Sequence, residues 1–480
     1  MNRRCGGLWA LVGTLGLTAC TVGPDFRAPP APTQKAYTAM PVALSQDGAT
    51  LPAQSLALGA AVSEQWWRQF NSSTLDTTVA LALSNSPTIE QARARLAQAQ
   101  QSVRAVQAAL YPQLDLAAGM SRSRSLPVNG SGSSDLFSVG PLVSYSVDAF
   151  GGTRRLIEQQ SALADAQREQ LAAAHLTLTG NVVAQAIGIA AARDQTAAVE
   201  AVLAVDQQDV DLVRLSVQSG IAAAGDLVTA QSQLAADEAL LPPLRQQQAA
   251  AENALAMLVG RSAAIWKAPQ FTFDTLTLPS NLPLVVPSAL IRVRPDIRAS
   301  EAQLHASSAA IGIATAGLYP QISLSASWTQ QAATMGTLFN GTNGLWAAAA
   351  SLTAPIFHGG ALRAQRQAAI DAFNAQLAAY RQTVLVAFNQ VADVLQALEH
   401  DAQLIAAQGR ALAAASASLR LARDTYSAGA GSFLQVLAAQ RIYQQARLGY
   451  SRAISQRYLD TVQFFAAMGG GAATRPAAPG

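Results

Sequence analysis

Cys20 is the residue whose neighbours most clearly indicate a chemical reaction. Two arginines near the start precede a short apolar stretch, and small residues stand directly before the cysteine. That order is typical of a secretory signal peptide with its cleavage site. The tetrapeptide Leu17-Thr18-Ala19-Cys20 resembles a bacterial lipobox, which predicts a signal peptide over residues 1–19 and a lipid-modified Cys20 as the first mature residue. The alternative is an ordinary signal peptide in which the cysteine stands by coincidence.

The other candidates for chemistry are scattered along the chain. The histidines stand singly, without the paired spacing of metal ligands; they are His175, His305, His358 and His400. Gly429-Ala430-Gly431 falls between two helix-like runs and not after a strand, so we interpret it as a turn and not as a phosphate-binding loop. No nucleophile stands beside a base in a recognisable pattern. We therefore expect no catalytic residues, no cofactor and no metal site, and no enzyme activity.

The composition narrows the class of protein. Of the 480 residues, 50% are hydrophobic and only 13% are charged, which is few for a soluble protein of this size. The net charge of +3 without basic clusters argues against binding to nucleic acid. After the signal peptide there is no apolar run of about 18 residues, so no transmembrane helix is expected.

The elements that must position any functional residue occur twice. Leu110-Tyr111-Pro112-Gln113-Leu114 returns 208 residues later as Leu318-Tyr319-Pro320-Gln321-Ile322, and Gly151-Gly152 returns as Gly359-Gly360 at the same spacing. Such agreement at one spacing indicates an internal duplication. The expected organisation is a lipidated tether over 20–62, a first repeat over 63–260, a Pro-rich equatorial linker over 261–292, a second repeat over 293–468 and a disordered tail over 469–480.

Each repeat is predicted to contain a helix, two strands, a very long helix and a returning helix. The expected helices cover 72–84, 87–110, 153–219 and 226–260, then 295–318, 361–428 and 434–468. Pro242-Pro243 should kink or restart the helix over 226–260. Trp66-Trp67 and Phe70 are expected to anchor a small belt formed with the linker. The expected strands cover 113–125 and 136–149, then Gln321–Thr329 and Trp346–Ile356.

The strands alternate between apolar and small polar residues. Ile322, Leu324, Ala326 and Trp328 alternate with Gln321, Ser323, Ser325, Ser327 and Thr329. One apolar face and one small, polar face fit a barrel that faces lipid outside and water inside. The alternative is the half-buried sheet of a soluble protein.

The helix expected over 361–428 carries a coiled-coil seam. Apolar residues follow 3,4 steps from Ile370 to Tyr426, and Asp401 and Gln408 are the only polar interruptions. A second seam lies beside it, formed by Leu385, Phe388, Ala392 and Leu395. Two seams on one helix require neighbours on both sides, as in a ring of helices.

Four strands in one chain cannot form a barrel alone. An open sheet in lipid would leave its edge N–H and C=O groups without hydrogen bonds. Several chains must therefore close one barrel. Three chains give twelve strands and two give eight, and the residues themselves leave this choice open.

Several motifs then point to a family. The segments resemble, in order along the mature chain, those of TolC-like outer-membrane efflux lipoproteins of the NodT branch, which includes OprM and CusC; they are Cys20-Thr21-Val22-Gly23-Pro24-Asp25-Phe26-Arg27, Trp66-Trp67-Arg68-Gln69-Phe70, Phe150-Gly151-Gly152, Leu241-Pro242-Pro243-Leu244 and Arg294-Pro295-Asp296-Ile297-Arg298. The resemblance implies a mixed α and β fold and a homotrimer whose 12-stranded barrel in the Gram-negative outer membrane stands above a periplasmic barrel of helices. It implies passive conduction together with a periplasmic adaptor protein and an inner-membrane pump of the RND type.

The resemblance also implies where the duct closes. The helix-to-helix turns at Gly220 and Gly429 would be the periplasmic tips, and Arg420, Arg423 and Asp424 lie within about two helical turns of Gly429. We predict that these charges form the periplasmic gate. The alternative is a solvated i,i+4 pair of Arg420 and Asp424. Possible partners on the first long helix are Asp209, Asp211 and Arg214.

Two other functions fit part of the sequence. A periplasmic adaptor shares a lipobox and a long helical hairpin, and a structural coiled-coil lipoprotein shares the helices. Two hairpins together with four barrel-like strands disfavour both. The 6 methionines and 4 histidines are few for a metal exporter, which favours organic substrates.

Overall fold

The computed structural model describes residues 21–39, 42, 44, 53–125 and 132–471. The expected signal peptide, Cys20 and most of the expected tail lie outside these residues. Two compact units are present. One consists of the chain up to Pro29 with Arg95–Gln167 and Ala299–Tyr380, and the other of Pro30–Ala94, Arg168–Arg298 and the chain from Arg381. Each unit therefore contains parts of both repeats.

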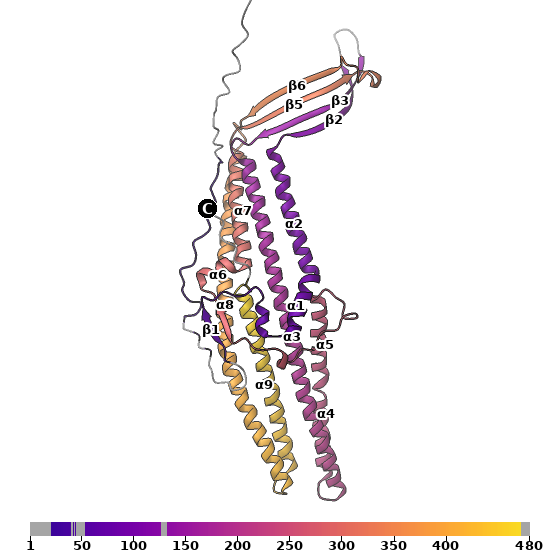
Figure 1. Cartoon of the computed structure of the whole chain (residues 1–480), viewed down its shortest axis with the longest axis vertical. Coiled ribbons are helices and arrows are strands. Elements are labelled where there is room, and N and C mark those ends of the chain that lie inside the picture. Colours follow the sequence, from indigo (N-terminus) through magenta and orange to yellow (C-terminus); the bar gives the residue numbers. More distant parts are fainter. Residues whose placement is uncertain (1–20, 40–41, 43, 45–52, 126–131, 472–480) are drawn as a thin grey trace, which may run out of the picture. The chain divides into compact units, whose positions relative to one another are not determined.

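The first unit contains one antiparallel sheet in the order β2-β3-β5-β6 (Figure 1). Its strands are β2 (Gln113–Ser125), β3 (Gly132–Val147), β5 (Gln321–Ala332) and β6 (Gly344–Thr353). All four predicted strands are present, with several ends shifted. β3 begins at Gly132, earlier than expected, because its pairing with β2 continues to Ser125. β3 ends at Val147 because the next residue, Asp148, accepts hydrogen bonds from the N–H groups of Thr153 and Arg154 at 2.9 and 3.0 Å. β6 ends at Thr353, shortly before Pro355, which has no N–H for a sheet hydrogen bond.

The register of the sheet gathers apolar side chains on one face. Residues directly opposite each other on paired strands share a face. Val143 lies opposite both Leu114 and Ala326, and Ala326 lies opposite Ala348, so an apolar row crosses all four strands. On the other face Ser144 lies opposite both Gln113 and Ser325. The predicted alternation is therefore confirmed in the paired strands.

The long helices occur within two residues of the predicted ends. They are α3 (Gly152–Gln218) and α8 (Ala361–Ser427), of 67 residues each. The helix expected over 226–260 is divided into α4 (Ala224–Glu238) and α5 (Leu241–Leu258), because the two prolines start a new helix where their missing N–H groups are not needed. The other helices are α1 (Ser73–Asn85), α2 (Pro87–Gln107), α6 (Pro287–Val293), α7 (Pro295–Ala316) and α9 (Phe433–Ala467), with short 3-10 helices at Trp66–Phe70, Ala108–Leu110, Phe273–Thr275 and Met335–Thr337.

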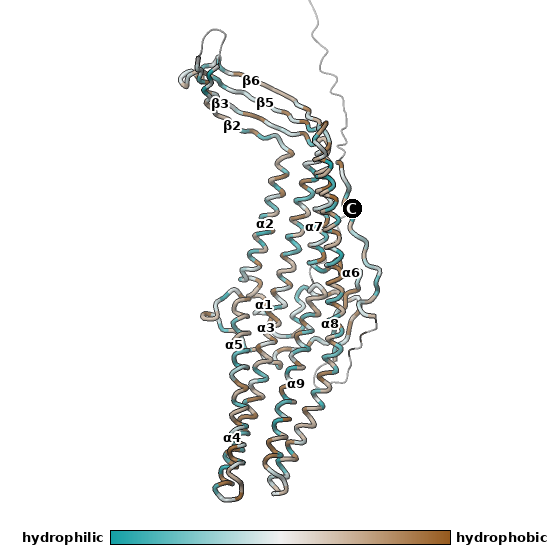
Figure 2. The backbone as a smooth tube through the Cα atoms, turned by 180° about the vertical axis from the view of Figure 1, so that it is seen from behind, coloured by the Kyte–Doolittle hydropathy of each residue, from teal (hydrophilic) through white to brown (hydrophobic). Residues whose placement is uncertain are grey.

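One described helix, α3, contains a stretch long and apolar enough to cross a membrane by length and composition. A helix in the core of a soluble protein passes the same test. Figure 2 shows hydrophobic and hydrophilic residues interleaved along the long helices, which is typical of helices that pack against other helices.

The predicted seam on α8 is buried. Val391, Leu398 and Ile405 are at most 5% exposed, and the buried positions continue to Leu419. Asp401, one of the two polar interruptions, is also buried. The second seam is covered unevenly, since Leu395 is buried while Leu385 remains 54% exposed.

The expected tether requires a correction. Its last part forms the short strand β1 (Ser55–Leu58), which pairs in parallel with β4 (Asn281–Leu284) of the linker. A four-residue strand has little periodicity, and its partner lies 226 residues away, so no local turn signal marks the pair.

The predicted belt is confirmed in the second unit. Trp66 is fully buried and stacks on Phe465 with ring centroids 5.1 Å apart. The carbonyl of Phe70 accepts a hydrogen bond from the N–H of Thr277 in the linker at 2.8 Å. The Tyr458 hydroxyl donates to the Leu276 carbonyl at 2.8 Å. The linker is therefore tied to both the aromatic segment and α9.

Candidate functional site

The two helix-to-helix turns of the second unit are built alike. Gly220 and Gly429 have φ values of +72° and +73°, a left-handed conformation that favours glycine. The N–H groups of Gly220 and Ile221 donate to carbonyls of Val217 and Ser216. At the second turn, the N–H groups of Gly429 and Ala430 donate in the same pattern to Tyr426 and Thr425. Both predicted tip glycines therefore end a long helix by the same motif.

Apolar side chains hold the two hairpins together near these turns. Val210 and Val213 of α3 and Ala230 of α4 form one buried cluster with Phe433 and Leu437 of α9. The cluster joins the α3–α4 hairpin to α9. A polar network next to it therefore lies at a junction of both hairpins.

That polar network connects four helices. Arg423 of α8 donates to the amide oxygen of Gln440 on α9 at 3.2 Å, and the amide nitrogen of Gln440 donates to Asp206 on α3. One helical turn further, Gln444 of α9 donates to Asp237 on α4 at 2.9 Å. Gln233 of α4 also donates to Asp237, at 2.8 Å. Release of these bonds would free the hairpins from one another at their polar contacts.

Two acidic groups in the network have raised pKa values. Burial raises the pKa of Asp206 to about 7, helped by the hydrogen bond to Asp237 and the charges of Asp237 and Asp209, and Arg423 opposes the rise. Burial also raises the pKa of Asp209, again opposed by Arg423. The Oδ2 atom of Asp206 is buried and accepts no hydrogen bond from a described donor.

The three predicted gate residues line one cavity of about 580 Å³ between α3, α8 and α9. Arg420, Arg423 and Asp424 share this cavity with Gln440 and Arg447. Of the three, Arg423 makes the link to α9 described above. Within the described residues, no ion pair joins Arg420 to Asp424.

The predicted partners on α3 separate into two groups. Asp209 lies close enough to Arg423 for their charges to interact. Asp211 and Arg214 instead pair with each other on α3, at 2.5 Å. Asp209 therefore belongs to the network.

Comparison with known proteins identifies the family. A family model described as "Outer membrane efflux protein" matches residues 78–261 and 286–470. The chain belongs to the outer membrane efflux protein family. This efflux protein is 31% identical over 438 residues to the pyoverdine export outer membrane protein OpmQ of Pseudomonas aeruginosa, with 88% of this chain and 92% of OpmQ covered. It is 30% identical over 481 residues to the outer membrane protein OprJ of the same species, with 98% and 97% covered.

The fold of the efflux protein is that of a solved channel. The structure of the outer-membrane channel OprN matches with a TM-score of 0.84 at 26% identity, covering 94% of this chain and 99% of OprN. The protein is therefore a TolC-like channel component of an efflux system in the Gram-negative outer membrane. The predicted mixed α and β fold is confirmed.

Several residues of the efflux protein's polar network were not predictable from the sequence. Arg447 of α9 donates to Asp194 of α3 at 2.9 Å, and Ser451 donates to the same carboxylate. On α8, burial raises the pKa of Asp401 to about 7, helped by the hydrogen bond to Asp460 of α9 and its charge and opposed by Arg457 of α9. Asp401 was visible as a polar interruption of the seam. The other network residues resemble the many exposed polar residues of the long helices in sequence. Only the packing of one helix against another shows that they belong to the network.

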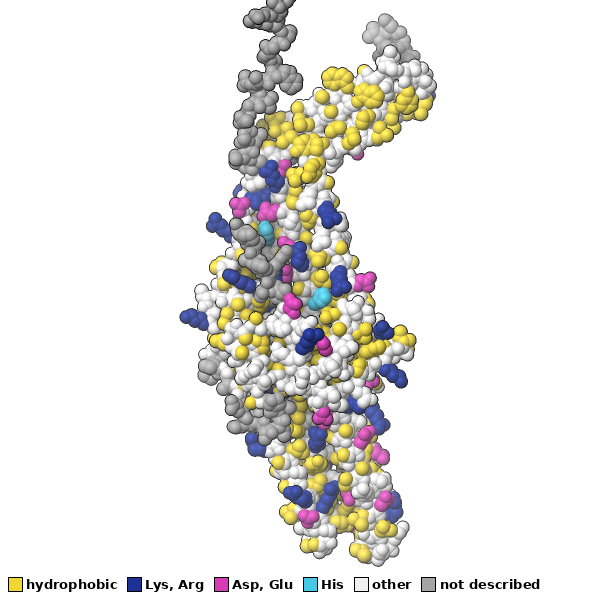
Figure 3. All heavy atoms as spheres, in the orientation of Figure 1, with side chains coloured by type: hydrophobic (Ala, Val, Ile, Leu, Met, Phe, Trp, Pro, Cys, Tyr) yellow, Lys and Arg dark blue, Asp and Glu magenta, His cyan; other side chains and the backbone are white. Residues whose placement is uncertain are grey.

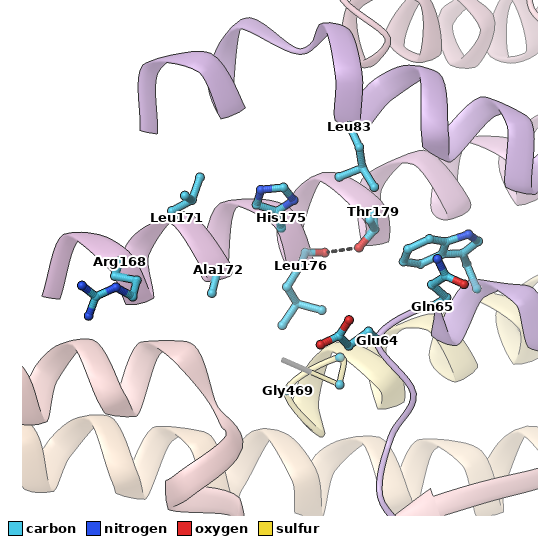
Figure 4. A pocket seen from close by; sticks show the side chains of 13 residues that line it. Glu64, Gln65, Leu83, Arg168, Leu171, Ala172, His175, Leu176, Thr179 and Gly469 are labelled. Atoms are coloured by element: carbon cyan, nitrogen blue, oxygen red, sulfur yellow. Dashed lines mark hydrogen bonds between the residues drawn. The ribbon is translucent and has the colours of Figure 1, made fainter. Parts of the chain in front are cut away.

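A second cavity, of about 490 Å³, lies in the belt of the efflux protein (Figure 4). Glu64, Leu83 and His175 line it, and the Thr179 hydroxyl donates to the Leu176 carbonyl at 2.9 Å. Burial and the charge of Arg93 lower the pKa of His175. Among the residues with described positions, no three His, Cys, Asp or Glu side chains gather as metal ligands would.

Proposed function

We propose that three copies of this efflux protein close a 12-stranded barrel and passively conduct substrates from an inner-membrane pump across the periplasm and outer membrane. The observation that carries the proposal is the open sheet, whose outer strands β2 and β6 each have one unpaired edge within the described chain. Edge N–H and C=O groups have no water to bind in the hydrocarbon region of a membrane. Strand β6 of one copy therefore pairs with β2 of the next.

The size of the barrel favours three copies over two. A barrel of eight strands has an interior just wide enough to be filled by side chains. A duct for solutes needs a wider interior, which twelve strands provide. Two copies would give the eight-stranded barrel, and three give the twelve-stranded one.

The two faces of the sheet suit lipid and water. Hydrophobic side chains gather over the sheet in Figure 3. Trp346 is 79% exposed and lies opposite Trp328, as expected of aromatic side chains in the girdle of an outer-membrane barrel. Ser323 and Ser351, opposite each other on the other face, would line the lumen.

The long helices support the same assembly. Leu385 on the second seam of α8 is 54% exposed although its heptad position is that of a buried residue. A helix of the neighbouring copy would cover it and continue the ring of helices. The polar network at the tips, with Arg420, Arg423 and Asp424, would hold the ring closed until a periplasmic adaptor protein docks.

The energy for export comes from the partners in this proposal. An RND-type pump in the inner membrane drives the substrate, the adaptor joins pump to duct, and the duct catalyses no reaction. The relatives differ in the cargo that their names state, with pyoverdine for OpmQ and cations for CusC of Escherichia coli. The few methionines and histidines of this chain favour an organic cargo.

The N-terminal features belong to the same proposal. Residues 1–19 act as a signal peptide and lipid on Cys20 anchors the chain in the outer membrane. The two repeats and the linker keep the boundaries proposed from the sequence, and the tether over 20–62 includes β1, which pairs with the linker. An adaptor or a structural lipoprotein is the alternative function, and neither needs four strands with a lipid-facing side.

Cross-linking tests the closure of the barrel. Within the chain, β3 pairs with β5 so that Val143 lies opposite Ala326. The repeat relates Ala326 to Ala118, and Phe150 to Phe357, so Val143 corresponds to Ala350. We therefore expect Ala350 of one copy to lie opposite Ala118 of the next.

The double variant Ala118→Cys/Ala350→Cys should give cross-linked dimers and trimers in outer-membrane vesicles after mild oxidation. The matched control is Ala118→Cys/Ala349→Cys, whose second cysteine points to the other face. Cross-linking confined to single chains, or equal cross-linking in both variants, would contradict the proposed closure.

A further inference from the structure

The segment that follows Cys20 is bound by a buried arginine at the first turn of α3. Arg155 is 5% exposed. Its Nε donates to the Val22 carbonyl at 3.1 Å, and its Nη2 donates to the Gly23 carbonyl at 3.3 Å and to Asp25 at 2.7 Å. Its Nη1 donates to Glu158 at 2.7 Å. One guanidinium thus binds two carbonyls and one carboxylate of a segment about 130 residues earlier in the chain.

Contacts on both sides of the arginine complete the site. The N–H of Val22 donates to the carbonyl of Phe150 at 3.1 Å, which fixes the backbone direction of the segment. The ring of Phe26 stacks on His305 of α7 with centroids 4.5 Å apart. The Nε2 atom of His305 lies 2.9 Å from Glu158, which orients the imidazole beneath Phe26.

Two glycines allow the segment to come this close. A Cβ atom on Gly23 would lie 2.4 Å from the Cα of Gly312 on α7, so the two backbones touch. A Cβ atom on Gly151 would lie 2.8 Å from the Cα of Thr21. Backbone contact of this kind excludes any larger residue at both positions.

The second repeat has the arginine but lacks the rest of the site. Arg155 corresponds to Arg363, which is exposed. At the same spacing Glu158 corresponds to Arg366, Gly312 to Arg104 and His305 to Ala97. The carboxylate, the gap and the stacking surface are therefore all replaced. Both repeats therefore contain the arginine, but only in the first repeat do the surrounding residues bind the N-terminal segment.

We propose that the Arg155 site is a receptor for the chain's own N-terminal segment, which fixes the lipid anchor at the foot of the sheet and thereby promotes assembly in the outer membrane. The inference rests on the proposed lipidation of Cys20. The site holds Thr21, the residue next to the anchor, beside Gly151 at the junction of β3 and α3.

The length of the tether shows why such a receptor matters. After the Arg155 site, the next side-chain hydrogen bond described for the tether is that of Tyr37, whose hydroxyl donates to the Val285 carbonyl at 2.6 Å. About 17 residues separate Tyr37 from Cys20, and that length of extended chain reaches roughly 60 Å. Without the Arg155 site, the lipid would be free to enter the membrane far from the barrel. With the site occupied, one peptide bond separates the anchor from a fixed point.

The test uses the full-length protein in outer-membrane vesicles, with a nitroxide spin label on Arg27→Cys. Three quantities are measured: the mobility of the label, the mass of the mature N-terminus and the yield of trimer per lipidated chain. Arg155→Ala should release the segment, with the ratio of docked to released label falling about tenfold or more, since hydrogen bonds to a charged group are strong. Trimer yield should fall with it, while the lipid mass on Cys20 stays unchanged.

Two further variants separate docking from folding. Asp25→Asn/Phe26→Ala changes only the segment and should reproduce the effect of Arg155→Ala. Arg363→Ala removes the corresponding exposed arginine and should change neither mobility nor yield. The receptor proposal would be wrong if the label stays immobile in both Arg155→Ala and Asp25→Asn/Phe26→Ala. It would also be wrong if these variants release the segment and the trimer yield does not change. If the unmutated protein carries no lipid on Cys20, the proposed lipidation is wrong. The mass of the N-terminus shows this result independently of label mobility and trimer yield.

Discussion

The Nε2 atom of Gln444 on α9 lies 2.9 Å from Oδ1 of Asp237 on α4, so one hydrogen bond joins the two hairpins near their tips. Asp237 is also the neighbour that helps to keep Asp206 protonated. The contact between the hairpins therefore lies beside a buried carboxyl group, Asp206, whose pKa is raised to about 7. Its strength should depend on pH near neutrality.

The first prediction concerns this dependence. The folded-state pKa values of Asp206 and Asp401 are both raised to about 7, whereas an unfolded aspartate titrates near 3.9. The folded protein then binds more protons between about pH 4 and pH 7, so its stability falls as pH rises through that window and levels off above it. The thermal unfolding midpoint should be higher at pH 5 than at pH 8.

Replacement of one carboxyl separates the two contributions. Asp206→Asn imitates the protonated form, so it should raise the unfolding midpoint at pH 8 and have little effect at pH 5. The exposed neighbour Glu238 provides the control, and Glu238→Gln should leave the pH dependence unchanged. An unfolding midpoint of Asp206→Asn that falls below wild type at pH 8 would argue against the raised pKa of Asp206.

The second prediction concerns the gate. Arg423→Ala removes the 3.2 Å link to Gln440, and Asp424→Ala and Arg420→Ser change the other charges of the same cavity. Loss of one hydrogen bond to a charged group should raise the open fraction of single channels by about tenfold. Arg441→Ala, an exposed change one residue from Gln440, should stay as closed as wild type. If Asp424→Ala and Arg420→Ser form trimers that stay closed, the gate lies elsewhere.

The third prediction concerns lipid contact. Ala326 and Ala350 share the apolar face of the sheet, while Ser325 lies on the other face. An arginine at Ala326 or Ala350 should destabilise the folded protein by about 2–4 kcal/mol near the bilayer midplane. Ser325→Arg should be tolerated better and alter conductance instead. Urea titration in lipid vesicles measures the difference, and equal destabilisation on both faces would refute the assigned alternation.

The fourth prediction concerns the belt. Trp66 is fully buried and stacks on Phe465, so Trp66→Ala should cost about 3–5 kcal/mol of unfolding free energy. Trp66→Phe keeps an aromatic ring against Phe465 and should cost less. Ile265→Ala in the same region removes a side chain that is 79% exposed and should have little effect on the unfolding midpoint. Similar losses in Trp66→Ala and Ile265→Ala would contradict the role of the stack.

Much of the fold was predictable because the sequence repeats its strongest local signals. The seam from Ile370 to Tyr426 and the alternation from Ile322 to Trp328 are long, and proline or glycine marks an end of each element. The pair of β1 and β4 was missed because Ser55–Leu58 is short and its partner lies far along the chain. Local patterns contain no information about such a distant parallel partner.

The polar network was predictable only in part. Arg423 stood near a glycine turn, which marked it as a residue close to the tip. Asp206 and Asp237 have no such marker, because an aspartate on a long helix is usually exposed. Their burial follows from the packing of α3 and α4 against α9, which depends on contacts between distant segments. Arg155 was noted as part of the repeat, but its ligands are three backbone and side-chain groups at the start of the chain.

The most direct test of the central claim is the current carried by purified trimers in a planar lipid bilayer. We expect discrete steps of current that are proportional to voltage and need no energy source, with larger or longer openings in Asp424→Ala. An adaptor or a structural lipoprotein would give no such steps. Correctly folded trimers that insert into the bilayer and carry no current, in both wild type and Asp424→Ala, would contradict a conducting duct.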